Sequence, residues 1–342
     1  MHMADALVSP AVGGTMWAAT AVTTAYCAKK LREEDDAARV PLMGVAGAFI
    51  FAAQMLNFTI PGTGSSGHLG GGLILAILLG PEAAFLVMAS VLAVQALFFA
   101  DGGLLSLGAN IFNLGVFPAF LAYPLIYKPI VGASPTRGRV IAGSMAAAVV
   151  GLQLGAFGVV LETVYSGISA LPFTSFVLLM QPIHLAIGIV EGLITAGVVL
   201  FVLQAQPELL IRRGGDEKLT GLNLKPVFIG LLIAAVVAGG AISWFASTNA
   251  DGLEWSMGKV AGREIEAADP IHRTLAAVQE KTAFLPDYAF KTSADAEAGE
   301  SGASWPAVDV GTSTSGILGA VIVLALAAGI GLVLRVRARR RE

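Results

Sequence analysis

The chain has 342 residues, of which 56% are hydrophobic and only 13% charged, and its formal net charge is −3. A soluble domain carries about 25% charged residues, and a disordered chain is poor in aliphatic side chains, so the composition excludes both classes. It indicates a polytopic membrane protein without a nucleic-acid partner. The single cysteine, Cys27, leaves no intrachain disulfide and no multi-cysteine metal cluster.

In chain order, roughly nine apolar runs approach the 20 or so residues that a helix needs to cross a bilayer. They lie at 8–28, 41–58, 69–80, 82–100, 103–127, 140–161, 177–205, 227–246 and 316–334. The third run is short and rich in glycine, so we expect it to be tilted or only partly embedded. Backbone groups in lipid must bond internally. We therefore predict an all-α bundle of seven helices, then two further transmembrane helices around a soluble segment at 247–314.

The basic residues set the expected orientation. Of the 21 Lys and Arg residues, 16 lie in the segments 29–39, 128–139, 206–225 and 335–342, whereas the connectors 59–70, 101–103 and 162–176 contain none. By the positive-inside rule, the four basic segments are cytoplasmic. The N-terminus and the 247–314 segment are then extracytoplasmic, and the C-terminus is cytoplasmic.

The first two residues form a potential chelator. A side chain as bulky as His2 generally prevents removal of Met1, so we expect the mature chain to start Met1-His2 with a free α-amine. That amine, the deprotonated amide nitrogen of His2 and its imidazole Nδ1 can close a five- and a six-membered ring on one cation. Such a planar, nitrogen-rich set favours Ni(II) or Cu(II), and low-spin Co(II) tolerates it.

The natural fourth ligand is His68, in a loop that faces the same side as Met1. Six glycines between positions 62 and 72 allow this backbone to approach a buried site closely. An incidental histidine at position two and a structural loop histidine are the alternative readings. Polar residues nearby are candidates for orienting the ligands by hydrogen bonds, although polar contacts between helices explain them equally well. They are Asp5, Gln54, Asn57, Ser65 and Ser66.

His184 and Glu191 lie seven residues apart in the seventh run, on one helix face. Ionisable residues inside a membrane suggest a proton relay or an ion path, and a packed polar contact is the alternative. As a relay, the pair would make the chain an autonomous ion-coupled secondary metal transporter. A hydrolytic enzyme is disfavoured, because the sequence contains no HExxH motif.

The start Met1-His2-Met3-Ala4-Asp5-Ala6-Leu7-Val8-Ser9-Pro10 and the loop from Asn57 to His68 closely resemble the CbiM/NikM family. These proteins are the substrate-binding (S) components of energy-coupling-factor importers for cobalt and nickel. The resemblance covers about residues 1–205 and implies metal ligation by Met1, His2 and His68. It also implies a non-catalytic subunit that works with a membrane coupling (T) subunit and cytoplasmic ATPases in the cytoplasmic membrane of a bacterium or archaeon.

Residues 226–342 resemble the small companion subunit of these importers, joined to the carrier through a cytoplasmic linker at 206–225. Ala250-Asp251-Gly252-Leu253-Glu254 is similar to the PDGLE signature of such domains, with Ala250 where proline is expected. Gating of the site, stabilisation of the assembly and a plain spacer all remain open as the role of this region. The residues do not choose between nickel and cobalt.

Overall fold

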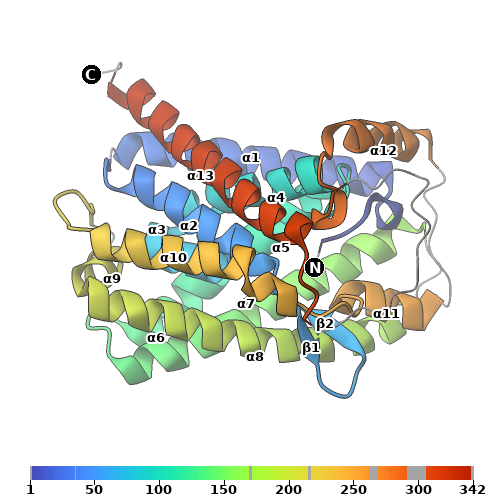
Figure 1. Cartoon of the computed structure of the whole chain (residues 1–342), viewed down its shortest axis with the longest axis horizontal. Helices are drawn as coiled ribbons and strands as arrows, with labels where there is room; N and C mark the ends of the chain where they lie inside the picture. The colour runs from blue at the N-terminus through green and yellow to red at the C-terminus, as the bar shows by residue number, and fades with distance from the viewer. Residues whose placement is uncertain are drawn as a thin grey trace.

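The computed structural model describes residues 2–34, 36–168, 172–214, 217–261, 269–290 and 306–339. Helices dominate the described part of the chain (Figure 1). In chain order they are α1 (Pro10–Glu34), α2 (Arg39–Gln54), α3 (Gly72–Leu79), α4 (Pro81–Phe99), α5 (Leu107–Val116), α6 (Lys128–Val131), α7 (Arg137–Ser166), α8 (Phe173–Ala205), α9 (Pro207–Gly214), α10 (Lys225–Gly240), α11 (Gly252–Ala261), α12 (Pro270–Thr282) and α13 (Val310–Arg339).

Shorter turns and one hairpin complete the secondary structure. Single 3-10 turns cover Asp5–Leu7, Ile242–Phe245 and Pro286–Tyr288, and π-helical turns at Phe117–Tyr127 join α5 to α6. Strands β1 (Phe58–Ile60) and β2 (Ser65–Gly67) pair antiparallel, with Thr59 opposite Ser66. Gly62 and Gly64, in the turn between the strands, have φ values of 77° and 76°, a conformation that glycine adopts without strain.

Five helical stretches among the described residues are long and apolar enough to cross a membrane: Pro81–Phe99, Leu107–Val131, Arg137–Ser166, Phe173–Ala205 and Val310–Arg337. They coincide with five of the predicted runs, which confirms a helical, multi-pass membrane protein. α2 and α10, with 16 residues each, are apolar but shorter. α1 overlaps the first predicted run, at 8–28, but it begins at Pro10 and is not among these five stretches.

Two predicted boundaries were wrong. The run predicted at 41–58 leaves the helical conformation after Gln54, and Phe58 already belongs to β1. The run predicted at 69–80 yields only the eight residues of α3, because Gly71 and Gly80 stand at its two ends with φ values of 79° and 85°. All residues of α3 are buried inside the molecule, so this short helix satisfies its backbone among other helices.

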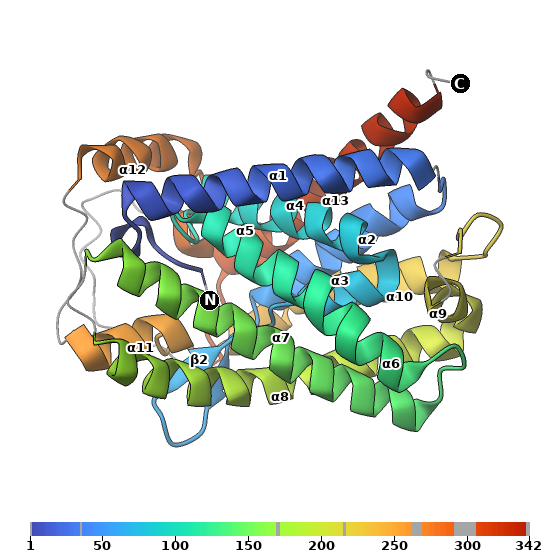
Figure 2. The same cartoon turned by 180° about the vertical axis from the view of Figure 1, so that it is seen from behind.

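The two ends of the molecule differ in the elements that gather there. α6, α9 and the C-terminal end of α13 lie at one end of the long axis, and these elements hold much of the basic sequence (Figures 1 and 2). The N-terminal segment, the hairpin, α11 and α12 gather at the other end. The N-terminal segment and the hairpin carry or lead to the two candidate ligand histidines, His2 and His68.

The C-terminal helices pack directly on the N-terminal ones. α13 lies against α2, α4 and α10, and it crosses α10 where Gly316 meets Gly239. A Cβ atom at Gly316 would stand 2.5 Å from the carbonyl oxygen of Gly239, so this crossing depends on the missing side chains.

Candidate metal centre

The N-terminal segment is fixed by the backbone of Met3. The side-chain oxygen of Asn110, on α5, accepts a hydrogen bond from the Met3 N–H at 2.8 Å, and its amide donates to the Met3 carbonyl at 3.2 Å. The N–H of Gly103 donates to the same carbonyl at 3.0 Å. Because both polar backbone groups of Met3 are engaged, the position of the adjacent His2 is set by the backbone.

Asp5 makes a second attachment between this segment and the start of α5. Its Oδ1 accepts hydrogen bonds from the backbone N–H groups of Leu105 (2.7 Å) and Ser106 (3.0 Å). Helix starts leave such N–H groups without intrahelical partners, and a carboxylate there is favourable. Asp5 thus supports the candidate site by holding the segment that carries His2.

The loop that follows His68 is held by two buried side chains. Gln54, at the end of α2, donates to the carbonyl of Gly70 at 2.8 Å. Glu191, on α8, accepts hydrogen bonds from the N–H of Gly70 at Oε2 (2.9 Å) and from the N–H of Gly71 at Oε1 (3.1 Å). These three contacts fix the backbone two and three residues beyond His68.

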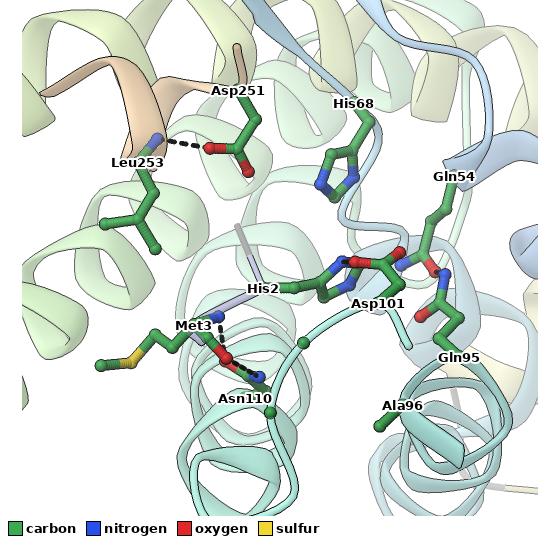
Figure 3. A network of polar contacts seen from close by, with 12 residues as sticks. His2, Met3, Gln54, His68, Gln95, Ala96, Asp101, Asn110, Asp251 and Leu253 are labelled. Carbon is green, nitrogen blue, oxygen red and sulfur yellow. Dashed lines mark hydrogen bonds and ion pairs between the residues drawn. The ribbon is translucent and has the colours of Figure 1, made fainter. Parts of the chain in front are cut away.

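The two anchored segments bring His2 and His68 together. Their rings are stacked with centroids 5.0 Å apart and planes 25° from parallel (Figure 3). The side chain of His2 is 7% exposed, and His68 is partly buried. Burial lowers the pKa of His68 to about 3, so its imidazole is neutral near pH 7 and keeps a lone pair that can bind a metal.

Asp101 and Tyr288 hold the His2 ring. Nδ1 of His2 donates to Oδ1 of Asp101 at 2.7 Å, and the hydroxyl of Tyr288 donates to Oδ2 at 2.6 Å. Burial alone would raise the pKa of Asp101, but the adjacent His2 and these two hydrogen bonds lower it well below its usual range. The carboxylate is therefore ionised and is a strong acceptor for the ring.

This contact differs from the sequence-based expectation. In the predicted chelate Nδ1 of His2 binds the cation, whereas in the structure Nδ1 faces Asp101. Nε2 is buried, and no hydrogen-bond partner for it lies among the described residues. Met1, the other predicted ligand of this segment, lies outside the described residues.

Asp251 enters the same region from the C-terminal part of the chain. Its backbone forms an isolated parallel bridge with Ser66, and its carboxylate lies on the side of His68 that faces away from Gln54 (Figure 3). Asp101 and Tyr288 were not singled out in the sequence, and Asp251 was noted there only as part of the PDGLE-like segment, not as a site residue. Asp101 could have been found there, because it is the one carboxylate in the connector 101–103, on the same side as Met1.

Three predicted supporting residues make their contacts elsewhere. Asn57 lines a cavity of ≈ 720 Å³ between β1, α8 and the turn after α10, whose lining includes neither His2 nor His68. The hydroxyl of Ser65 bonds with that of Thr63 at 2.8 Å, and the hydroxyl of Ser66 donates to the carbonyl of Asn249 at 2.8 Å. The two serines hold the hairpin and its neighbour rather than an imidazole.

His184 and Glu191 have separate partners. Nδ1 of His184 bonds with the carbonyl of Met180, one turn earlier in α8, at 2.8 Å, whereas Glu191 holds the Gly70–Gly71 backbone. His184 lines a small cavity with His68. The remaining histidine, His272 on α12, bonds through Nε2 with the carbonyl of Val8 at 2.9 Å and so also anchors the N-terminal segment.

Within the described ranges, no group of three or more His, Cys, Asp or Glu side chains is arranged to hold a metal ion. The described side chains at the candidate site are the two imidazoles of His2 and His68, with Asp101 bonded to His2 and Asp251 beside His68.

A multi-pass helical bundle with buried histidines at one end defines the chain as a membrane protein with a candidate metal centre. Comparison with known families identifies it further. Residues 2–209 match the family described as the cobalt uptake substrate-specific transmembrane region, and residues 225–336 match the PDGLE domain. The chain belongs to the cobalt uptake substrate-specific transmembrane family, whose CbiM-type region is here fused to a PDGLE domain. It is a component of nickel or cobalt transport and not an enzyme.

The relatives match either nearly the whole chain or a part of it. A chain of Archaeoglobus fulgidus, provisionally named fused nickel transport protein NikMN, is 32% identical over 335 residues, which cover 95% of this chain and 96% of the relative. The fused nickel transport protein NikMN of Rhodobacter capsulatus is 33% identical over 229 residues, covering 62% and 65%. The cobalt transport protein CbiM of Sorangium cellulosum is 31% identical over 222 residues, covering 62% and 95%.

A solved structure supports the fold. The crystal structure of a truncated transition metal transporter superposes with a TM-score of 0.53 at 31% identity, covering 60% of this chain and 99% of the other. The predicted resemblance to the CbiM/NikM family and to a PDGLE-type companion is therefore confirmed.

Proposed function

We propose that this chain captures a divalent nickel or cobalt ion outside the cell and passes it to an ATP-driven importer. The observation that carries the proposal is the stacked pair of His2 and His68, two residues that come from separate segments, each fixed by its own buried hydrogen bonds. The relatives named for nickel and for cobalt support this pair of ions as the substrate.

In this proposal the cation is bound by the α-amine of Met1, by the amide nitrogen and Nδ1 of His2, and by His68. A rotation of the His2 ring by 180° about its Cβ–Cγ bond brings Nδ1 to the chelate side and turns Nε2 toward Asp101. The ring would then have the arrangement common in metal-binding histidines, with one nitrogen on the metal and the other N–H on a carboxylate. The rotation moves Nε2 to the position that Cε1 now holds, on the Asp101 side of the ring, so the carboxylate has to shift along the ring edge to accept from Nε2.

The proposed topology has the seven helices of an S component in residues 1–205, a cytoplasmic linker at 206–225, and two further spans around an extracytoplasmic segment in 226–342. The basic elements at one end of the molecule and the candidate site at the other support this orientation (Figure 2). The membrane would be the cytoplasmic membrane of a bacterium or archaeon, with the N-terminus outside.

A T subunit and cytoplasmic ATPases are the proposed partners. The alternative, an autonomous ion-coupled transporter using His184 and Glu191, has less support, because these side chains bond to different backbone groups instead of to each other. Uptake of nickel and cobalt into liposomes separates the two proposals. The chain alone should bind metal without accumulating it, and uptake should require the partners and ATP. Accumulation driven by an ion gradient with the chain alone would contradict the proposal.

A further inference from the structure

The C-terminal region packs beside the hairpin that leads to His68. The N–H of Ser247 donates to the carbonyl of Asn57 at 2.7 Å, and the N–H of Ser66 donates to the carbonyl of Ala250 at 2.8 Å. The segment 247–251 therefore runs beside the hairpin as an additional extended chain, next to the residues that lead to His68. Backbone hydrogen bonds of this kind fix its register with the loop.

Asp251 ends this segment and starts α11. Its Oδ1 accepts hydrogen bonds from the N–H groups of Leu253 and Glu254, both at 2.8 Å, which caps the helix. Figure 3 shows the carboxylate directed into the space beside His68, on the far side of that ring from Gln54. Asp251 and His68 also line one cavity of ≈ 10 Å³, about the room for a single water molecule.

The position of Asp251 is set by close packing on α8. A Cβ atom at Gly252 would stand 2.5 Å from Cγ2 of Ile183 and 3.4 Å from Cε1 of His184. The backbone that follows Asp251 thus sits directly on the helix below the site, so its carboxylate is held in place by the helix cap, the hairpin and this contact together.

We propose that Asp251 is the charge partner of the bound cation, so that the C-terminal domain completes the metal site. This inference rests on the function proposed above. Figure 3 shows the carboxylate of Asp251 beside His68, whereas that of Asp101 is bonded to His2. Each of the two imidazoles therefore has a carboxylate near it that offsets positive charge on a bound cation. The negative charge of the Asp251 carboxylate attracts the arriving cation. The segment 247–254 then lies over the bound cation.

The test is the affinity and association rate of Ni²⁺ and Co²⁺ with the purified full chain. In Asp251→Asn and Asp251→Ser the new side chain still caps α11, because Asn and Ser are good capping residues, but the charge is gone. We expect each variant to bind about 10–100-fold more weakly. The association rate should also depend less on ionic strength, because one attracting charge has been removed.

Asp309→Asn is the matched control. Asp309 caps α13 in the same domain, with Oδ2 accepting from the N–H of Thr312 at 2.6 Å, and it has no part in the proposed site. Affinity and salt dependence in this variant should equal those of the unmodified chain. If the Asp251 variants bind as tightly as the unmodified chain, or if the Asp309 variant loses as much affinity as they do, the inference about Asp251 is overturned and the proposed function is not affected. Failure of the unmodified chain to bind either ion overturns the proposed function.

Discussion

The residues of the candidate site fall into two groups: those that the sequence alone marks as candidate metal ligands, and those that only the structure brings to the site. His2 and His68 are recognisable without a structure, because a histidine at position two and a histidine in a glycine-rich loop are unusual in so apolar a chain. Tyr288 gives no such signal, Asp101 gives only that of a carboxylate in a connector on the Met1 side, and the PDGLE-like segment does not indicate that Asp251 approaches His68. Their role depends on tertiary contacts such as the 2.6 Å hydrogen bond from Tyr288 to Asp101, which no local pattern predicts.

The first prediction concerns the Asp101–His2 contact. Asp101→Asn should weaken nickel or cobalt binding about 10–100-fold, because the amide is a poorer acceptor for the imidazole N–H than the carboxylate. Tyr288→Phe keeps the ring that stacks on Phe99 and removes only the hydroxyl, so it should weaken binding less. Affinities are measured by competition with a chromophoric chelator. Tyr165→Phe, at a tyrosine that is 78% exposed, is the control and should have no effect.

A second prediction concerns the stability of the metal-free protein in acid. The pKa of His68 is about 3 in the folded chain, against about 6.5 when unfolded. Between these values the unfolded state binds a proton that the folded state does not, so the free energy of unfolding falls as the pH is lowered from 6.5 toward 3. At pH 5 this loss reaches at most about 2 kcal/mol, since solvent reaches part of the ring.

His68→Gln lacks this titration, so the unmodified chain should lose more thermal stability in detergent between pH 7 and pH 5 than the variant does. Equal losses in the two proteins would show that His68 is protonated as easily in the folded state as in the unfolded state.

At the scale of elements, the sequence predicted where helices occur better than where they end. Apolar runs at 82–100, 140–161 and 316–334 became α4, α7 and α13. The hairpin at 58–67 was not predicted, because its pairing depends on a turn with two positive-φ glycines and on the neighbouring segment 247–251. The brevity of α3 likewise follows from glycines whose conformation only the folded chain determines.

The third prediction concerns the attachment of α8 to the His68 loop. Glu191→Gln retains one acceptor oxygen but leaves one of the N–H groups of Gly70 and Gly71 facing an amide nitrogen. An unsatisfied buried N–H should lower the free energy of unfolding by about 1–3 kcal/mol, and metal binding should weaken with it. Thermal unfolding in detergent and metal affinity are the measurements. Glu208→Gln, at a largely exposed glutamate on α9, is the control.

The Glu191→Gln variant also tests the alternative, ion-coupled transport mechanism. If Glu191 carried protons, its conversion to glutamine would abolish gradient-driven uptake while leaving metal affinity intact. Loss of affinity with no gradient-driven uptake in either protein is the outcome that the present account expects.

At the scale of the whole molecule, the CbiM-type region and the PDGLE domain form one packed structure. α13 lies in contact with α2, α4 and α10. The C-terminal region also reaches the site through Asp251, which lies beside His68 in Figure 3, and through Tyr288, which donates to Asp101. Hydropathy predicted the spans of both regions, but it carries no information about which helices pack together. Close contacts such as that of Gly316 with Gly239 appear only in the assembled bundle.

A fourth prediction tests this packing. Gly316→Ala places a Cβ 2.5 Å from a backbone oxygen that cannot move aside easily, and overpacking of this kind costs about 1–3 kcal/mol. The midpoint of thermal unfolding should fall. Gly329→Ala, on the same helix with nothing within 4 Å of its Cβ, should leave the midpoint unchanged or raise it. Similar midpoints for both variants would mean that α10 and α13 do not cross closely.

The central claim is that the first two residues and His68 together hold the metal, and the measurement that tests it most directly is metal content by mass spectrometry. Because Met3 is fixed by Asn110, one proline inserted between Met1 and His2 preserves His2 and everything after it but moves the α-amine out of the chelate. Proline is the residue to insert because it has no amide N–H, so its nitrogen cannot extend the chelate to the displaced amine. An N-terminal tag converts that amine into an amide. We predict bound nickel or cobalt in the chain with its native start, and loss of the metal after the insertion, the tag or His68→Ala. Equal metal in all four proteins would contradict it.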